Sequence, residues 1–283
     1  LSGFCYTKTQ ALSLVRALMW MVGKQMDTYD KHHVKTLYSL ENKVVVITGG
    51  AGFLGKAFAS AVCEAGARCA LIDVKLKRLK DAKDELTSMG HEVTLWPVDI
   101  TNENELDDTL AEIINQYQRI DVLINAAALA MEDLQRGGSS YFDPVEKYKK
   151  ELWQNALDVN LTGTFMICQR IGDHMRVNRS GVIINIASDV AVISPDHRIY
   201  EPNPTTGYEG MPFNTPLAYS VSKTGILGMT RYLSTYWAKD GVRVNAISPA
   251  GVYRQQAPDF VDELVSRIPM GRMANLHELK GPI

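Results

Sequence analysis

Tyr219 and Lys223 lie four residues apart in a segment whose apolar residues recur with helical spacing, so both side chains are expected on one face of a helix. A free phenol has a pKa of about 10 and is a poor base at neutral pH. An ammonium group one turn away stabilises the phenolate and lowers that pKa. Such a pair could move the hydroxyl proton of an alcohol while hydride leaves the carbon. Tyr232 and Tyr236 share this helix, so an aromatic residue here is not by itself informative.

A glycine-rich turn follows a short apolar run at 44–47, which has the pattern of a strand buried on both faces. Gly49 would allow a tight turn, Gly52 a close approach of backbone to a pyrophosphate, and Gly55 close packing of the next helix. The free N–H groups and positive dipole end of that helix favour phosphates. The turn therefore predicts a dinucleotide site, with an ordinary strand-to-helix turn as the alternative.

A regular alternation of strands and helices must position these residues. Strands are expected at 44–47, 69–73, 93–98, 121–125, 182–187 and 242–247, separated by helices at about 53–65, 76–89, 101–117, 144–175 and 217–239. Thr101 is expected to cap the third of these helices. Repeated units of this length predict an α/β fold, a three-layer, Rossmann-like, doubly wound parallel sheet with helices on both faces. Such sheets bind ligands beyond the carboxyl ends of their strands.

Asp73 ends the second strand, about 20 residues after the glycine turn, where an acid can accept hydrogen bonds from the hydroxyls of an adenosine ribose. Its charge repels a 2′-phosphate, which favours NAD over NADP. Lys75, Lys77 and Arg78 follow closely and could soften this preference. The alternative is an aspartate that only caps a helix. Polar or small residues also follow the third, fourth and fifth strands, and the candidates there are Asp99, Ile100, Asn125, Ala126, Ala127 and Ser188.

Several motifs together resemble the short-chain dehydrogenase/reductase family over residues 41–283: TGGAGFLG, NAAA, the Asn160 of LDVNLTG, Ser188, YSVSK and NAISPAGV. The resemblance implies that Ser188 holds the substrate oxygen, that Tyr219 is the acid/base and that Lys223 binds the nicotinamide ribose. It also implies that Asn160 holds a water that relays protons to Lys223. The expected coenzyme-binding residues are Gly49, Gly52, Phe53, Leu54, Gly55, Asp73, Asp99, Ile100, Asn125, Ala126, Ala127, Tyr219, Lys223, Pro249, Gly251 and Val252.

The chain departs from the family pattern in three places. Its glycine spacing is that of the family's extended branch, whereas the other motifs resemble the shorter branch. Ser188 and Tyr219 are unusually far apart, which indicates an insertion at about 195–213 that is rich in proline, glycine and aromatic residues. We expect this insertion to be a substrate lid, with a surface decoration or an intersubunit contact as the alternative. The sequence also stops where the family normally continues into a last strand.

Composition limits the partners. The chain has 283 residues with 30 basic and 32 acidic side chains, so neither nucleic acid nor a membrane surface is expected to bind. The four cysteines lack ligand-like spacing, which predicts reduced thiols, no metal site and a cytoplasmic location. Residues 1–40 are expected to be an extension with a short helix, and 41–283 a single catalytic domain. By resemblance, the helices at 144–175 and 217–239 pair across a homodimer or homotetramer, although they could equally be core.

The sequence thus predicts an NAD(P)-dependent oxidoreductase that interconverts a secondary alcohol and a ketone by hydride transfer. The polar, aromatic insertion favours a sugar or another hydroxylated substrate. One alternative is a nucleotide-sugar epimerase or dehydratase with tightly bound NAD. Another is a non-catalytic dinucleotide-binding protein that acts through protein contacts.

Overall fold

The computed structural model describes residues 38–129, 139–200 and 214–283. By internal contacts the chain divides into two units, Leu1–Leu40 and Glu41–Ile283. All described helices and strands belong to the second unit. Residues 1–37 lie outside the described residues, so the extension at 1–40 and its short helix stay predictions.

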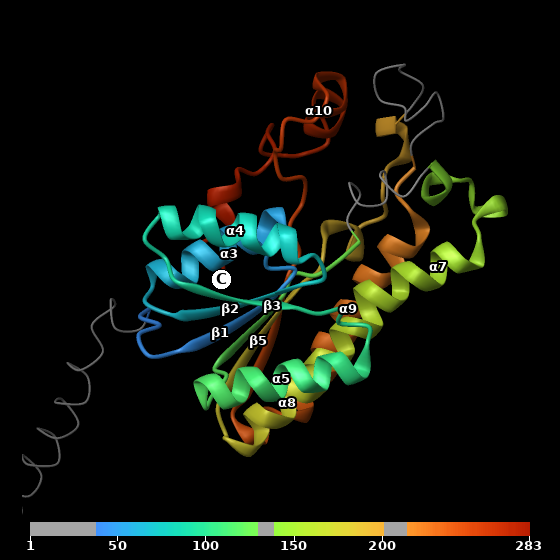
Figure 1. Cartoon of the computed structure of the whole chain (residues 1–283). Coiled ribbons are helices and arrows are strands. Elements are labelled where there is room, and N and C mark those ends of the chain that lie inside the picture. The colour runs from blue at the N-terminus through green and yellow to red at the C-terminus, as the bar shows by residue number, and fades with distance from the viewer. Residues whose placement is uncertain (1–37, 130–138, 201–213) are drawn as a thin grey trace, which may run out of the picture. The chain divides into compact units, whose positions relative to one another are not determined.

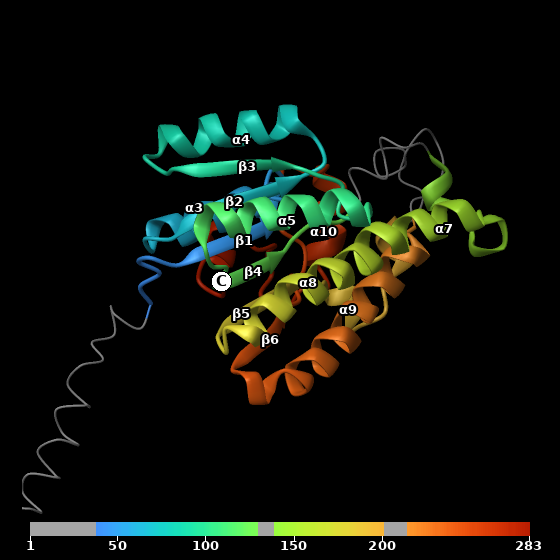
Figure 2. The same cartoon turned by 60° about the horizontal axis from the view of Figure 1, so that its bottom comes forward.

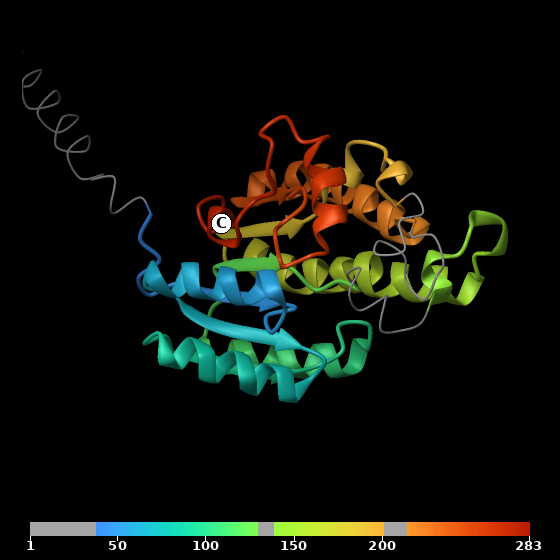
Figure 3. The same ribbon diagram turned by 90° about the horizontal axis from the view of Figure 1, so that it is seen from above.

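Within the described residues, six parallel strands form one sheet in the order β3-β2-β1-β4-β5-β6 (Figure 2). Figure 3 shows the visible arrowheads pointing to the same end of the sheet. The strand order reverses between β1 and β4, and a ligand is expected beyond their carboxyl ends. The strands are β1 (Val44–Thr48), β2 (Arg68–Asp73), β3 (Val93–Pro97), β4 (Val122–Asn125), β5 (Gly181–Ile186) and β6 (Val242–Ile247).

Helices cover both faces of the sheet (Figure 1). On one face lie α3 (Phe53–Glu64) and α4 (Leu76–Ser88), and on the other α5 (Glu103–Tyr117), α8 (Thr164–Val177) and α9 (Leu217–Tyr236). The shorter helices are α7 (Lys150–Leu157) and α10 (Pro258–Val265). Short 3-10 turns occupy Ser139–Phe142, Val145–Lys147, Asp189–Ala191, His197–Tyr200, Ala238–Asp240 and Leu276–Leu279.

The largest core lies between the sheet and the α5, α8 and α9 layer, where side chains such as Val46, Leu123, Ile167 and Ile183 are fully buried. All five residues of β1 are buried, as its unbroken apolar run predicted. The sheet buries its apolar residues on both faces, so the predicted three-layer α/β fold is confirmed.

Two local predictions were wrong. The helix expected over 144–175 begins only at Lys150, because Pro144 precedes a separate 3-10 turn, and it is interrupted by a π turn at Asp158–Gly163. The cap of α5 is Asn102, whose side chain accepts a hydrogen bond from the Glu105 N–H at 3.4 Å. The Thr101 hydroxyl instead donates to Asp99, at 2.7 Å.

Candidate active site

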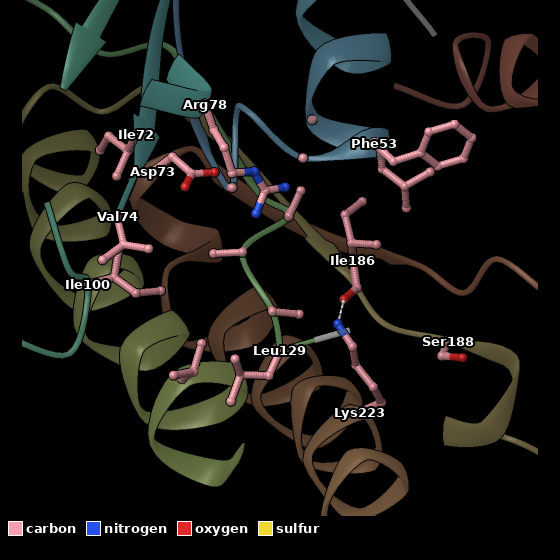
Figure 4. Close-up of a pocket in the computed structure, with 18 of the residues that line it drawn as sticks. Phe53, Ile72, Asp73, Val74, Arg78, Ile100, Leu129, Ile186, Ser188 and Lys223 are labelled. Carbon is pink, nitrogen blue, oxygen red and sulfur yellow. Dashed lines mark hydrogen bonds between the residues drawn. The ribbon is translucent and has the colours of Figure 1, made fainter. Parts of the chain in front are cut away.

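A cleft of about 560 Å³ opens at the carboxyl ends of the strands, where the strand order reverses (Figure 4). It is lined by the glycine turn, by the residues after β2, β3, β4, β5 and β6, and by α9. The structure thus brings together fifteen of the residues predicted from the sequence: Gly49, Gly52, Phe53, Leu54, Gly55, Asp73, Asp99, Ile100, Ala126, Ala127, Ser188, Tyr219, Lys223, Pro249 and Val252.

The glycine turn has the geometry of a phosphate cradle. Gly49 has φ of +62°, and a Cβ there would lie 2.7 Å from the Ala126 oxygen. A Cβ on Gly55 would lie 2.1 Å from the Gly49 oxygen, so only glycine allows the helix to start this close to the turn. Gly52 caps α3 without a side-chain hydrogen bond, and the first turn carries no acid. The helix therefore presents N–H groups and positive potential to the cleft, which fits a dinucleotide's diphosphate.

Asp73 lies at the end of β2 and is buried, with one carboxylate oxygen accepting a hydrogen bond from the Lys75 N–H at 3.2 Å. Its side chain lines the cleft together with Arg78. Figure 4 shows both residues well separated from Phe53, which begins α3. The carboxylate thus lines the cleft beside Lys75 and Arg78, and its binding of a ribose stays a prediction.

Asn125 and Gly251 do not line the cleft. The Asn125 side chain donates to Asn185 on β5 at 2.8 Å, and the Thr48 hydroxyl donates to Asn125 at 3.5 Å. Asn125 therefore ties β1, β4 and β5 together. A Cβ on Gly251 would meet Leu264 and Met273, so this glycine packs against the C-terminal segment.

Asn160 lies in the π turn and is buried behind the cleft wall. Its oxygen accepts a hydrogen bond from the Leu129 N–H at 2.7 Å, and its amide donates to Ser222 at 3.2 Å. Leu129 lines the cleft and Ser222 lies on α9. The side chain thus connects the wall after β4 to the helix that carries Tyr219, and a π turn is a common feature of such sites.

Lys223 is 4% exposed, and its ammonium donates to the Ile186 carbonyl at 2.7 Å (Figure 4). The Nζ atom lies 5.8 Å from the centre of the Tyr219 ring. Burial lowers the pKa of Lys223 to about 8. The predicted spacing therefore does place the ammonium beside the phenol ring, on the same helix.

The pKa of Tyr219 is raised above its ordinary value, chiefly by burial and further by the charges of Asp189 and Tyr200, whereas a hydrogen bond with Ser188 acts in the opposite direction. This is the reverse of the lowering that the Lys223 spacing predicted. The reason is that helical spacing brings the two groups close but does not report how far the surrounding chain removes water from the phenol.

Ser188 is buried, and its hydroxyl donates to the Asp189 carboxylate at 2.8 Å. The Val190 N–H donates to the same oxygen, also at 2.8 Å, which fixes the carboxylate. Because a hydroxyl carries one proton, Ser188 in this state can only accept from other groups in the cleft. Asp189 is not among the residues predicted from the sequence, although an acid directly after Ser188 was a visible signal.

Arg254 was also missed. It follows the NAISPAGV motif and lines the cleft, with its guanidinium carbon 4.7 Å from the centre of the Phe53 ring. The helical and strand periodicities carry no information on such a residue, because it lies in a loop whose path depends on the packing of the C-terminal segment.

The start of the predicted lid is held against α10. Tyr200 stacks on Phe260 with ring centres 5.7 Å apart, and Asp196 accepts hydrogen bonds from both Arg198 and Arg267. Residues 201–213 of the insertion lie outside the described residues, so its role as a lid stays a prediction.

Over the ranges that the structure describes, no three histidine, cysteine, aspartate or glutamate side chains are grouped to hold a metal ion. Within the same ranges, no helix has the length and apolar character needed to span a membrane.

Comparison with known proteins gives consistent matches. Residues 43–200 match the family model described as short chain dehydrogenase, and residues 205–282 match one described as Enoyl-(Acyl carrier protein) reductase. A NAD-dependent glycerol dehydrogenase of Listeria innocua is 31% identical over 86% of this chain and 85% of its own length. A D-threitol dehydrogenase of Mycolicibacterium smegmatis is 29% identical over 86% of this chain and 84% of its own.

The fold comparison agrees. A short chain dehydrogenase from Leptospira borgpetersenii, solved with bound NAD+, matches with a TM-score of 0.70 and 29% identity, over 88% of this chain and 86% of that one. Together with the cradle, the cleft and the tyrosine–lysine pair, these matches confirm the family that the motifs indicated. The chain belongs to the short-chain dehydrogenase family and is an oxidoreductase that interconverts an alcohol and a ketone with a nicotinamide dinucleotide.

Proposed function

We propose that the chain uses NAD rather than NADP to interconvert a secondary alcohol and a ketone on a small polyhydroxylated substrate, with Tyr219 as the acid/base. The observation that carries the proposal is the convergence of Ser188, Tyr219 and Lys223 on the cleft that the glycine turn also lines. Relatives named for glycerol and D-threitol support a polyol or sugar-like substrate.

The preference for NAD rests on Asp73. Its buried carboxylate at the end of β2 can accept both ribose hydroxyls and repels a phosphate at the same place. Lys75 and Arg78 also line this part of the cleft and reduce the repulsion. The dehydrogenase names of the relatives do not favour the epimerase or the non-catalytic alternatives.

When bound, the nicotinamide supplies or accepts the hydride. Tyr219 gives its proton to the carbonyl oxygen during reduction and takes it back during oxidation. Since the pKa of Tyr219 is raised in the protein alone, the phenol is protonated at neutral pH and is ready to act as an acid. At a pKa of about 8, Lys223 is mostly protonated at pH 7, and its charge favours ionisation of the phenol in the oxidative direction.

Ser188 and Asn160 also have proposed roles at this site. Ser188 is proposed to hold the substrate oxygen beside Tyr219, for which its hydroxyl proton must turn from the Asp189 carboxylate to that oxygen. Asn160 positions the wall after β4 and is proposed to hold a water that relays protons to Lys223. The assembly is proposed to be a homodimer or homotetramer, because α8 and α9 expose apolar side chains such as Phe165, Tyr232 and Tyr236. Free thiols at Cys63, Cys69 and Cys168 support a cytoplasmic location.

Replacing Tyr219 with Phe tests the assignment. Loss of the phenol proton is expected to lower kcat by roughly 10²- to 10⁴-fold with a polyol substrate, because no other group takes its place. The dissociation constant of NADH, measured by fluorescence titration, is expected to stay within a few-fold of wild type. Tyr38→Phe is the matched control, since Tyr38 is 76% exposed, does not line the cleft and should lose no activity. Near wild-type turnover in Tyr219→Phe would contradict the proposed role.

A further inference from the structure

The loop that carries Arg254 is fixed on both sides. The Tyr253 N–H donates to the Ala274 carbonyl at 2.8 Å, and the Ala274 N–H donates to the Gly251 carbonyl at 3.0 Å. The Gln256 side chain accepts from the Arg254 N–H at 2.7 Å and donates to the Val252 carbonyl at 2.9 Å. The backbone of Arg254 is therefore held in place by hydrogen bonds rather than left as a free surface loop.

The Arg254 side chain is oriented by an aromatic ring. Its guanidinium carbon lies 4.7 Å from the centre of the Phe53 ring, within the range of a cation–π contact. Phe53 is the first residue of α3 and directly follows Gly52, the cap of that helix. The ring thus ties the guanidinium to the residue that begins α3, and both residues line the cleft.

Two positive features therefore belong to the same part of the cleft lining, since Phe53 begins α3 and its ring contacts the guanidinium. The first turn of α3 has neither a side-chain cap nor an acidic side chain, and the Arg254 guanidinium is a second positive group. Figure 4 shows Phe53 well separated from Asp73 and Arg78, so this charge lies away from the part of the cleft assigned to the ribose. An anionic group of a ligand at this part of the wall would be attracted both by the helix N-terminus and by the guanidinium.

We propose that Arg254 binds the diphosphate of the coenzyme, and that Phe53 holds its guanidinium in position. The inference rests on the proposed coenzyme site and assigns a residue to it. Arginine suits the task because its planar fork can give two parallel hydrogen bonds to phosphate oxygens while its face stays on the ring. The helix N–H groups and Arg254 then contact the same diphosphate from two separate elements of the chain.

Binding measurements test the proposal without relying on turnover. The dissociation constants of NADH, ADP-ribose and adenosine are measured for wild type and Arg254→Gln, by NADH fluorescence and by displacement of NADH. Loss of a charge-assisted contact is expected to weaken NADH and ADP-ribose about 10- to 100-fold, and to leave adenosine, which lacks phosphate, unchanged. Added salt should weaken NADH binding more in wild type than in the variant.

Two further variants separate charge from positioning. Phe53→Leu keeps the guanidinium but removes the ring, and a smaller loss of NADH affinity is expected. Arg243→Gln removes an exposed arginine on β6, outside the residues lining the cleft, and should leave NADH affinity unchanged. If wild type binds NADH and Arg254→Gln binds it equally well, the proposal is wrong, and a raised KM for the alcohol in that variant would assign Arg254 to the substrate instead. Failure of wild type to bind NADH would overturn the coenzyme site itself.

Discussion

At the scale of single residues, Asp73 is expected to decide between the two coenzymes. Wild type should bind NADH at least about tenfold more tightly than NADPH, because the buried carboxylate meets the 2′-phosphate with like charge. Asp73→Ser should lose most of this difference, since Lys75 and Arg78 then face the phosphate without opposition. Fluorescence titration with both coenzymes checks it.

Asp84→Ser is the matched control, because it removes an exposed acid from α4 without touching the cleft. Its two dissociation constants should equal those of wild type. Tighter binding of NADPH than NADH by wild type would contradict the reading of Asp73 as the selecting residue.

The sequence predicts which residues reach the cleft where their position depends on local spacing. The separation of Tyr219 and Lys223 by one helical turn places both in one cleft. It does not predict the direction of the Tyr219 pKa shift, because burial by distant segments dominates. Nor does it predict that the Ser188 proton goes to Asp189, or that Arg254 reaches Phe53, since those contacts depend on the three-dimensional path of loops.

At the scale of elements, the glycine turn and α3 form a unit that a single methyl group should disrupt. Gly55→Ala would bring a Cβ within 2.1 Å of the Gly49 oxygen, a clash with backbone that side-chain rotation cannot relieve. We expect the unfolding free energy to fall by about 1–3 kcal/mol or more, and NADH binding to be lost or strongly weakened. Urea denaturation and NADH titration measure the two effects.

Gly228→Ala provides the control within α9. No atom of the described residues lies within 4 Å of the Cβ it would add, so the higher helix propensity of alanine should stabilise the protein by about 0.5–1 kcal/mol. Unchanged stability and NADH affinity in Gly55→Ala would show that the turn is looser than its contacts indicate.

Element positions were easier to predict than their irregularities. The apolar run of β1 and the alternation of six strands with five helices are visible as periodicity, because burial on both faces demands apolar residues. The π turn at Asp158–Gly163 has no such signal, since one wider turn does not alter the pattern of a helix already amphipathic on either side. It is nevertheless the feature that carries Asn160 to Leu129.

At the scale of the whole molecule, the cleft forms only because distant parts of the chain meet at one end of the sheet. The glycine turn, the wall after β4, the Ser188 segment, α9 and the loop after β6 all contribute. Parallel topology explains this convergence, because every strand ends at the same edge. It also buries Lys223 between α9 and β5, where its charge opposes folding.

This burial gives a prediction for the stability of the entire chain. The pKa of Lys223 is about 8 in the folded protein against 10.5 in its ordinary state, so between these values the unfolded chain binds more protons. Below about pH 8 both states carry the proton and the full penalty of burying it is present, whereas above about pH 10.5 both are neutral and the penalty is gone. The unfolding free energy of wild type, relative to Lys223→Met, should therefore rise by about 3 kcal/mol between these pH values. Urea denaturation across the range measures the difference, with Lys239→Met as the control for loss of an exposed lysine. If the unfolding free energy of wild type changed with pH by the same amount relative to Lys223→Met as relative to Lys239→Met, the prediction would be wrong, because the pH dependence would then not come from the buried ammonium.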